Sequence, residues 1–241
     1  MNAMILAAGL GTRLRPLTEQ TPKPLLPVGG QPLIVWALAL LRRHGVREVV
    51  VNLHHLGEQI EQALGDGSAW GLRITYSREP VILGTGGGLK QAEPLFGGDD
   101  FLVVNGDTIM DVDLTALIAR HRAEQAVATM VLRDDPDTAR WGPVTLDVHD
   151  RVMTINGRGR LGTDPTRTTM FAGAHIVSSR LLRDVPPRRD SSIIDAYVAV
   201  LAAGGRVAGF RMGGYWSDVG TPERYAQVQR DAEAGLVRFP A

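Results

Sequence analysis

The N-terminal segment reads Leu6-Ala7-Ala8-Gly9-Leu10-Gly11-Thr12-Arg13-Leu14 and continues a short apolar run that begins at Ala3. An apolar run that ends in a glycine turn is typical of a buried strand, so we expect a strand over residues 3–7. Glycines allow backbone N–H groups to approach a phosphate closely, and Arg13 adds a guanidinium that can donate two hydrogen bonds to phosphate oxygens. The alternative is an ordinary strand-to-loop turn, because short glycine motifs also occur without a ligand.

Strand-like and helix-like runs alternate through the first half of the chain, which predicts βαβ units and a mostly parallel sheet. We expect strands over residues 3–7, 48–53, 72–77, 101–104 and 127–132, and helices over residues 32–44, 56–64, 114–121, 191–203 and 221–234. After residue 132 the strands become shorter and more antiparallel, with a hairpin tip at His149-Asp150. No repeat or low-complexity linker interrupts the sequence, so we expect one domain over residues 1–241.

The composition excludes several classes of protein. The chain has 241 residues, a formal net charge of +0 at pH 7 and no cysteine. A balanced charge argues against nucleic-acid binding, since nucleic-acid-binding surfaces carry a basic excess. The lack of cysteine excludes disulfides, thiolate zinc sites and a cysteine nucleophile, and it is consistent with a cytoplasmic location. No apolar run approaches the roughly 18 residues of a membrane span, so we expect no membrane association.

Two other phosphate-binding loops do not match the glycine turn. A Walker loop needs Lys-Ser or Lys-Thr after its last glycine, and a dinucleotide-binding loop needs a third glycine where Leu14 stands. The second expected strand ends Val51-Asn52-Leu53 and lacks the acidic residue that would bind a ribose. The sequence therefore disfavours an NAD-dependent oxidoreductase, which we keep as the weaker alternative.

Lys23 stands in a proline-rich segment that follows the glycine turn. Pro22 and Pro24 flank it directly. Because proline fixes its own φ and pushes the preceding residue toward extended conformations, we expect a stiff, non-helical segment that presents one cation. The alternative is a surface connection with a solvated lysine, the commoner fate of a single lysine.

Five segments together resemble the sugar-1-phosphate nucleotidyltransferases. They read GLGTRLRPLT (9–18), TPKPLLPVGGQPLI (21–34), LGTGGGLKQA (83–92), VVNGD (103–107) and WSDVGTPE (216–223). The resemblance extends over nearly the whole chain. It implies a Rossmann-like, three-layer α/β/α fold with a mostly parallel central sheet and a smaller antiparallel sugar-binding part. It also implies metal-dependent transfer of a nucleotidyl group from a nucleoside triphosphate to a sugar 1-phosphate.

The same resemblance assigns the phosphate and metal sites. It implies that Arg13, Lys23 and Asp107 are catalytic, and that Asp107 and Asp218 together hold Mg²⁺. On the residues alone either aspartate is also a good turn residue, but two hard oxygen ligands suit Mg²⁺ with bound phosphates. The nucleotide-binding residues implied are Ala8, Gly9, Gly11, Thr12, Arg13, Glu79, Gly84, Thr85 and Gly86.

The sugar side departs from the family pattern. The family has an acidic residue, a lysine and a proline after the mid-chain hairpin, whereas this chain reads Ile155-Asn156-Gly157-Arg158-Gly159. Arginine is not a neutral substitute for lysine, and the missing carboxylate puts glucose specificity in doubt. The sugar-phosphate-binding residues implied by the resemblance are Asn105, Gly142, Arg158, Gly173 and Asp218.

The sequence leaves the substrates open. NLHHLG (52–57) and LGDGS (64–68), with TGGG (85–88) and Glu79, resemble N-acetylmuramate 1-phosphate uridylyltransferases, whereas LGTGG (83–87) also resembles guanylyltransferases for mannose or heptose phosphates. A nucleotide-sensing module of the same fold is a further alternative, since a fold does not fix function. The expected partners are a nucleoside triphosphate and a sugar 1-phosphate. We expect no C-terminal β-helix domain, and the oligomeric state stays open.

Overall fold

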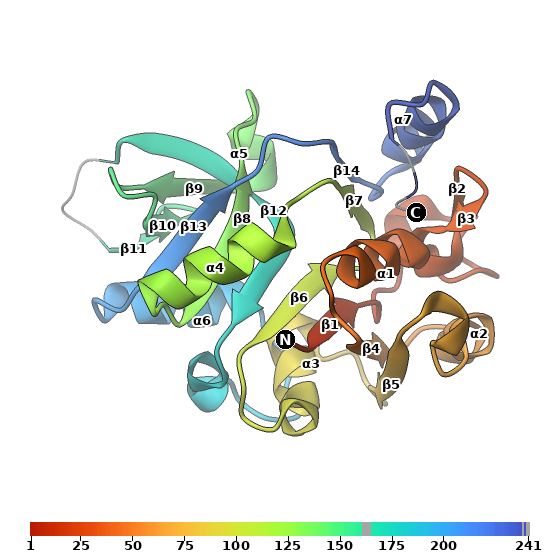
Figure 1. Ribbon diagram of the computed structural model, residues 1–241, viewed down its shortest axis with the longest axis horizontal. Helices are drawn as coiled ribbons and strands as arrows, with labels where there is room; N and C mark the ends of the chain where they lie inside the picture. The colour runs from red at the N-terminus through yellow and green to blue at the C-terminus, as the bar shows by residue number, and fades with distance from the viewer. Residues whose placement is uncertain (161–164, 238, 240–241) are drawn as a thin grey trace. The chain divides into compact units, whose positions relative to one another are not determined.

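The computed structural model describes residues 1–160, 165–237 and 239 and divides them into two compact units (Figure 1). The first unit comprises residues 1–82, 104–112 and 214–241, and the second comprises residues 83–103 and 113–213. Three separate segments therefore build the first unit, which brings residues near both ends of the chain together.

The first unit contains a parallel sheet with helices beside it (Figure 1). The strand over Glu48–Leu53 pairs in parallel with the strands over Ala3–Leu6 and Arg73–Arg78, as the alternating pattern predicted. The strands of the unit are β1 (Ala3–Leu6), β2 (Pro27–Val28), β3 (Gln31–Pro32), β4 (Glu48–Leu53), β5 (Arg73–Arg78), β7 (Thr108–Met110) and β14 (Trp216–Asp218). Its α-helices are α1 (Leu33–Arg43), α2 (Gly57–Leu64) and α7 (Pro222–Glu233), with 3-10 turns at Thr12–Leu14, Lys23–Leu25 and Ser68–Trp70.

The carboxyl ends of these strands are in register. Leu6 of β1 pairs with Asn52 of β4, and Asn52 pairs with Ser77 of β5. Gly106 also lies at this edge, because its backbone N–H donates to the carbonyl of Leu6 at 2.9 Å. A Cβ on Gly106 would lie 2.8 Å from the same carbonyl oxygen, so only glycine allows this close approach. The segment Asn105-Gly106-Asp107 is thereby held beside the glycine turn.

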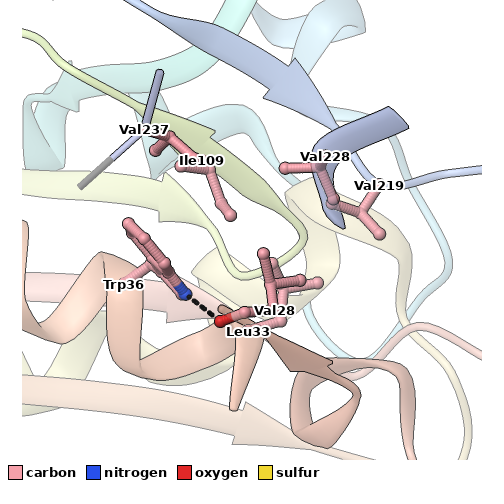
Figure 2. Close-up of a cluster of buried hydrophobic side chains, with 7 residues drawn as sticks. All are labelled: Val28, Leu33, Trp36, Ile109, Val219, Val228 and Val237. Atoms are coloured by element: carbon pink, nitrogen blue, oxygen red, sulfur yellow. Dashed lines mark hydrogen bonds between the residues drawn. The ribbon is translucent and has the colours of Figure 1, made fainter. Parts of the chain in front are cut away.

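A hydrophobic cluster holds the C-terminal part of the first unit in place (Figure 2). Trp36 of α1 donates its indole N–H to the carbonyl of Val28 at 3.2 Å. The cluster consists of Val28, Leu33, Trp36, Ile109, Val219, Val228 and Val237, all buried. Because Ile109 follows Asp107 closely and Val219 follows Asp218 directly, this apolar packing sets the positions of both aspartates.

The second unit is built mainly on antiparallel strands. β12 (Arg167–Val177) pairs antiparallel with β8 (Ala128–Arg133) and with β9 (Pro143–Leu146), while β13 (Val207–Arg211) pairs parallel with β8. The remaining strands are β10 (Val152–Ile155) and β11 (Arg158–Gly159), and β6 (Phe101–Asn105) crosses the unit boundary at residue 103. The helices are α3 (Gly84–Ala92), α4 (Leu114–Glu124), α5 (Thr138–Trp141) and α6 (Ile193–Ala202), with 3-10 turns at Glu93–Phe96 and Ser179–Asp184.

Two local expectations were wrong. Lys23 begins a 3-10 turn, since Pro24 at its second position has a φ compatible with such a turn. Asp218 ends strand β14, opposite Thr108, and does not lie in a turn.

A buried histidine makes the stability of the second unit sensitive to pH. His175 and Tyr197 share a hydrogen bond between β12 and α6, and burial lowers the pKa of His175 to about 3. The neutral imidazole stabilises the fold above the unfolded pKa of about 6.5, and this stability is lost as the pH falls from there toward 3. We expect the free energy of unfolding to decrease by up to about 2 kcal/mol between pH 7.5 and pH 5 through this group.

Urea unfolding of a His175→Gln variant at the two pH values measures this effect. Glutamine keeps an oxygen for the hydroxyl of Tyr197 but does not titrate, so the difference between the two pH values should shrink. His149→Gln, at the exposed hairpin tip, should unfold with the pH dependence of the unmodified chain. An unchanged pH dependence in His175→Gln would contradict the assignment.

Among the described residues, no helix has both the length and the apolar character needed to cross a membrane.

Candidate active site

The glycine turn after β1 exposes backbone and cationic groups at the carboxyl edge of the sheet. Gly11 precedes the 3-10 turn at Thr12–Leu14 and has φ +63°, a conformation that favours glycine. A Cβ on Gly11 would lie 3.0 Å from Thr18, whose hydroxyl donates to the carbonyl of Gly11 at 2.8 Å. Gly11 is therefore required by the fold of the turn.

Gly9 has no such structural requirement. A Cβ at Gly9 would meet no protein atom within 4 Å, and its φ lies outside the positive range. Gly9, Thr12 and Arg13 are exposed, whereas Ala8 is buried. The space beside Gly9 is therefore left open, as a ligand that approaches the backbone closely would need.

Lys23 and Asp107 form an ion pair beside this turn. Lys23 lies in the 3-10 turn after Pro22, and its side chain is 10% exposed. Asp107 follows β6 and is 30% exposed. An almost buried ammonium needs a partner, and the carboxylate provides it. The solvated-lysine alternative is therefore wrong, and the structure adds an ion pair with Asp107 that the sequence did not predict.

Asp218 reaches the same region from the far end of the chain. The backbone N–H of Val219 donates to the carbonyl of Asp107 at 2.9 Å, which fixes the two aspartate-bearing segments to each other. Asp218 also lies 3.1 Å from the guanidinium of Arg224, in the first turn of α7. A Cβ on Gly220 would lie 2.5 Å from Arg224 and 3.2 Å from Arg13, so Gly220 leaves room for these charged groups.

The groups around Asp218 shift its pKa in opposite directions. Burial raises the pKa of Asp218, and the nearby carboxylate of Asp107 raises it further. Lys23, Arg224 and Arg13 act in the opposite direction without cancelling the rise in this pKa. The raised pKa means that the carboxylate of Asp218 would be stabilised by additional positive charge, as a divalent metal would supply.

Asp107 and Asp218 suit Mg²⁺ in number and kind. Among the described residues, no group of three or more His, Asp or Glu side chains forms a metal-binding cluster. Mg²⁺ often binds one or two carboxylates and completes its shell with water and substrate phosphates. Asp218 Oδ1 is buried and accepts no hydrogen bond, although Arg224 is at ion-pair distance. The donor set therefore fits a Mg²⁺ that is shared with a phosphate ligand.

The glycine turn and the charged residues line one cleft of about 280 Å³. The lining residues are Gly9, Leu10, Gly11, Thr12, Arg13, Leu14, Lys23, Ile82, Asp107 and Gly220. Its size suits a small ligand, and two cations from the N-terminal segment reach it. The structure thus brings together Gly9, Gly11, Thr12, Arg13, Lys23 and Asp107.

Glu79 lies on the same sheet edge but is nearly buried, with 3% exposure. Its Oε1 accepts a hydrogen bond from Asn52 at 2.7 Å, and Asn52 accepts one from the backbone N–H of Ala7 at 2.8 Å. A ring nitrogen of His54 lies 2.8 Å from the backbone carbonyl of Glu79, and one of His55 lies 3.2 Å from that of Thr18, so both histidines have a structural role. Asn105, at the end of β6, is half-buried.

In the second unit, the glycines that the resemblance assigns to nucleotide binding have a packing role. A Cβ on Gly84 would lie 2.6 Å from the carbonyl of Ser191, and one on Gly86 would lie 2.9 Å from the Ser191 hydroxyl. Gly86 also donates its N–H to that carbonyl at 2.8 Å, and Thr85 accepts from the N–H of Ile193 at 3.0 Å. These residues join the start of α3 to the start of α6.

The sugar-side residues also lie in this unit. Gly142 has φ +89°, and a Cβ there would lie 2.5 Å from the side-chain oxygen of Asn156. Gly173 is buried in β12 with φ +88°, where the register with β8 shifts. Arg158 forms an exposed ion pair with Asp195 of α6 at 3.0 Å. A carboxylate therefore accompanies Arg158, although the local sequence lacks one.

Sequence reasoning missed Gly220, Arg224, Asn52 and Asp195. Only Asn52 had a signal, because it occupies the strand end where a dinucleotide site has an acidic residue. The others act through contacts with residues distant in sequence, which spacing cannot reveal.

The fold and the site define a nucleotidyltransferase. The family model for nucleotidyl transferases matches residues 2–235, and the chain belongs to this family. An N-acetylmuramate alpha-1-phosphate uridylyltransferase from Neisseria meningitidis is 43% identical over 241 residues, covering 97% of this chain and 99% of the relative. A mannose-1-phosphate guanylyltransferase from Mycobacterium tuberculosis is 33% identical, covering 100% of this chain and 67% of the relative. The chain is a sugar-1-phosphate nucleotidyltransferase.

Solved structures confirm the predicted Rossmann-like α/β fold. A Bacillus anthracis protein described as a glucose-1-phosphate thymidylyltransferase superposes with a TM-score of 0.83 and 26% identity, over 99% of this chain and 97% of that one. A UDP-glucose pyrophosphorylase from Acinetobacter baumannii superposes with a TM-score of 0.80 at 21% identity, over 99% of this chain and 95% of that one, and supports the fold alone.

The open space at Gly9 gives a direct test of ligand approach. We expect Gly9→Ala to weaken nucleoside triphosphate binding by about 10-fold or more, since one methyl group would stand between backbone and phosphate. The melting temperature should hardly change. Gly213→Ala is the matched control, because a Cβ there also meets no protein atom within 4 Å. Titration calorimetry with UTP and GTP measures the effect, and equal affinities in both variants would contradict the role of Gly9.

Proposed function

We propose that this enzyme transfers the uridylyl group of UTP to N-acetylmuramate 1-phosphate, with Mg²⁺, and releases pyrophosphate. The supporting observation is the 43% identity to the Neisseria meningitidis uridylyltransferase over 99% of that protein, whereas the guanylyltransferase relative matches over 67% of its length. The substrate named for the full-length relative is thus the best-supported choice for this chain.

The residues of the cleft suit in-line phosphoryl-type transfer. A phosphate oxygen of the sugar 1-phosphate attacks the α-phosphate, its bond to phosphorus forms, and the bond to the leaving pyrophosphate breaks. That oxygen is already ionised near neutral pH, because the second phosphate pKa is about 6, so no protein base is required. Arg13 and Lys23 neutralise charge on the triphosphate, and the glycine turn positions it.

Asp107 and Asp218 would hold the Mg²⁺, which when bound supplies positive charge that neutralises the phosphates. Lys23 is paired with Asp107 in this structure. With substrate present, the same ammonium would be available to phosphate oxygens within the cleft. Arg224 holds Asp218 in position from α7.

A release assay for pyrophosphate tests the proposal. Purified protein with Mg²⁺ should turn over UTP with N-acetylmuramate 1-phosphate faster than any other pair in a panel of triphosphates with glucose, mannose and N-acetylglucosamine 1-phosphates. A preference for GTP with mannose 1-phosphate would overturn the substrate proposal. Nucleotide binding without turnover of any pair would favour the sensing module, and activity without a divalent cation would contradict the Mg²⁺ proposal.

A further inference from the structure

Each of the two aspartates proposed to hold Mg²⁺ is paired with a cation of the same unit. The ammonium of Lys23 forms an ion pair with Oδ2 of Asp107. The guanidinium of Arg224 lies 3.1 Å from Oδ1 of Asp218. The side chains of Lys23, Arg224 and Asp218 are 10%, 18% and 21% exposed, so water and salt screen these charges only in part. Both carboxylates therefore have a counter-ion within the chain itself.

The backbone packs directly against the pair at Asp218. A Cβ on Gly220 would clash with Oδ1 of Asp218, and it would lie 2.5 Å from Nη2 of Arg224 and 3.2 Å from that of Arg13. The backbone N–H of Arg224 donates to the hydroxyl of Thr221, which caps α7. The helix cap and the missing side chain at Gly220 thus hold the guanidinium of Arg224 against Asp218, with a second guanidinium beside it.

The chain itself balances the charges of this cluster. Lys23, Arg224 and Arg13 bring three positive charges, and Asp107 and Asp218 bring two negative ones. A divalent cation that arrives alone meets an excess of positive charge, and it must compete with an ammonium or a guanidinium for each carboxylate. A triphosphate brings several negative charges and attracts the same ammonium and guanidinium groups.

We propose that Lys23 and Arg224 are internal counter-ions that keep the metal site closed to a bare divalent cation until a triphosphate neutralises them. The inference rests on the proposed function, in which Asp107 and Asp218 hold Mg²⁺. The ammonium of Lys23 has two partners in turn, Asp107 before the triphosphate binds and phosphate oxygens afterwards. Metal and triphosphate are then coupled, because each favours the arrangement of charges that the other needs.

Removal of either counter-ion should tighten the binding of a bare metal. Mn²⁺ is a suitable probe, since it takes the carboxylate and water ligands that Mg²⁺ takes. Without nucleotide, we expect Lys23→Met and Arg224→Met each to bind Mn²⁺ about 10-fold or more tightly than the unmodified chain. The reason is that a cation beside a carboxylate changes the affinity of that carboxylate for another cation by about one power of ten or more.

Electron paramagnetic resonance of free Mn²⁺ and titration calorimetry, both on the full chain, measure these affinities. Arg43→Met is the matched control, because Arg43 forms its ion pair with Asp111 at an exposed position of the same unit. This control should bind Mn²⁺ as the unmodified chain does. If Lys23 and Arg224 only support the fold of the site, their replacement leaves the Mn²⁺ affinity unchanged or lowers it. Either result, in either variant, overturns the inference.

The affinity for UTP in the presence of EDTA tests the second partner of Lys23. Without metal, Lys23→Met should bind UTP about 10-fold or more weakly, because a charge-assisted hydrogen bond to phosphate is lost. One substitution would then raise the affinity for metal and lower the affinity for triphosphate. A general loosening of the site would lower both affinities, and that result also overturns the inference.

Two further measurements keep the inference separate from the proposed function. If the unmodified protein releases no pyrophosphate, the proposed function fails, and the Mn²⁺ affinities alone decide the inference. Adding Asp218→Asn to Lys23→Met should abolish the gain in Mn²⁺ affinity, and a gain that persists would place the extra metal elsewhere and overturn the inference while the release assay stands. If Lys23→Met does not fold, as circular dichroism would show, Arg224→Met decides it.

Discussion

Replacing Lys23 with methionine is expected to lower the turnover number by about 100- to 1,000-fold, the loss seen when one preorganised donor is removed from a charged transition state. Lys23 is placed for this role by three features of the structure: the flanking prolines, the 3-10 turn that it begins, and the pairing of its ammonium with Asp107. Its side chain is 10% exposed, so water cannot replace the lost charge easily. Methionine keeps most of the volume and removes only the cation.

Lys90→Met is the matched control for this substitution. The sequence contains only these two lysines, and Lys90 forms its ion pair with Glu93 three residues further along the chain, in the second unit. A partly exposed pair of this kind contributes about 0–1 kcal/mol, so turnover should be unchanged. Steady-state kinetics on both variants, with thermal unfolding as a check on folding, measure the difference. Equal turnover numbers for Lys23→Met and the unmodified enzyme would show that Lys23 acts only in the fold.

The elements of the fold that could be predicted are those with a clear local signal. β4 was expected over residues 48–53 and is found there, because a run of valines has both strand propensity and a buried pattern. α7 begins after Thr221, which accepts from the N–H of Arg224 as a helix cap should. α3 lacks such a signal, because glycine has a low helix propensity. Gly84 and Gly86 are explained instead by their close approach to Ser191, which is distant in sequence.

The candidate site likewise contains residues that could be predicted from the sequence and residues that could not. Gly11, Arg13 and Lys23 could be predicted, because they lie in one short segment whose glycines and prolines have local meaning. The partnership of Asp107 with Asp218 could not be derived from spacing, because β14 and the cluster around Trp36 bring these residues together. From the sequence, Asn52 indicates only that the ribose-binding acidic residue is absent from this strand end. Its hydrogen bonds to Ala7 and Glu79 could not be predicted, because these residues are distant from it in sequence.

Asp218→Asn should lower turnover by about 100-fold or more and, in the absence of metal, raise the melting temperature. The activity falls because one of the two proposed Mg²⁺ ligands loses its charge. The stability rises because burial and the neighbouring Asp107 raise the pKa of Asp218, which means that its ionised form is disfavoured in the folded protein. Any gain in the free energy of unfolding appears as a rise in the melting temperature.

Metal titration separates this explanation from a general effect of removing an acid. Added Mg²⁺ should raise the melting temperature of the unmodified enzyme, since a ligand that binds only the folded state stabilises it, and should raise that of Asp218→Asn much less. Asp111→Asn is the matched control: its carboxylate forms an exposed pair with Arg43 at 2.8 Å in the same unit, so turnover and the Mg²⁺ response should persist. If Asp218→Asn melts at a lower temperature without metal, the contact with Arg224 outweighs the repulsion from Asp107. Asp218 would then be a structural carboxylate, and a metal site built on it would lose its electrostatic basis.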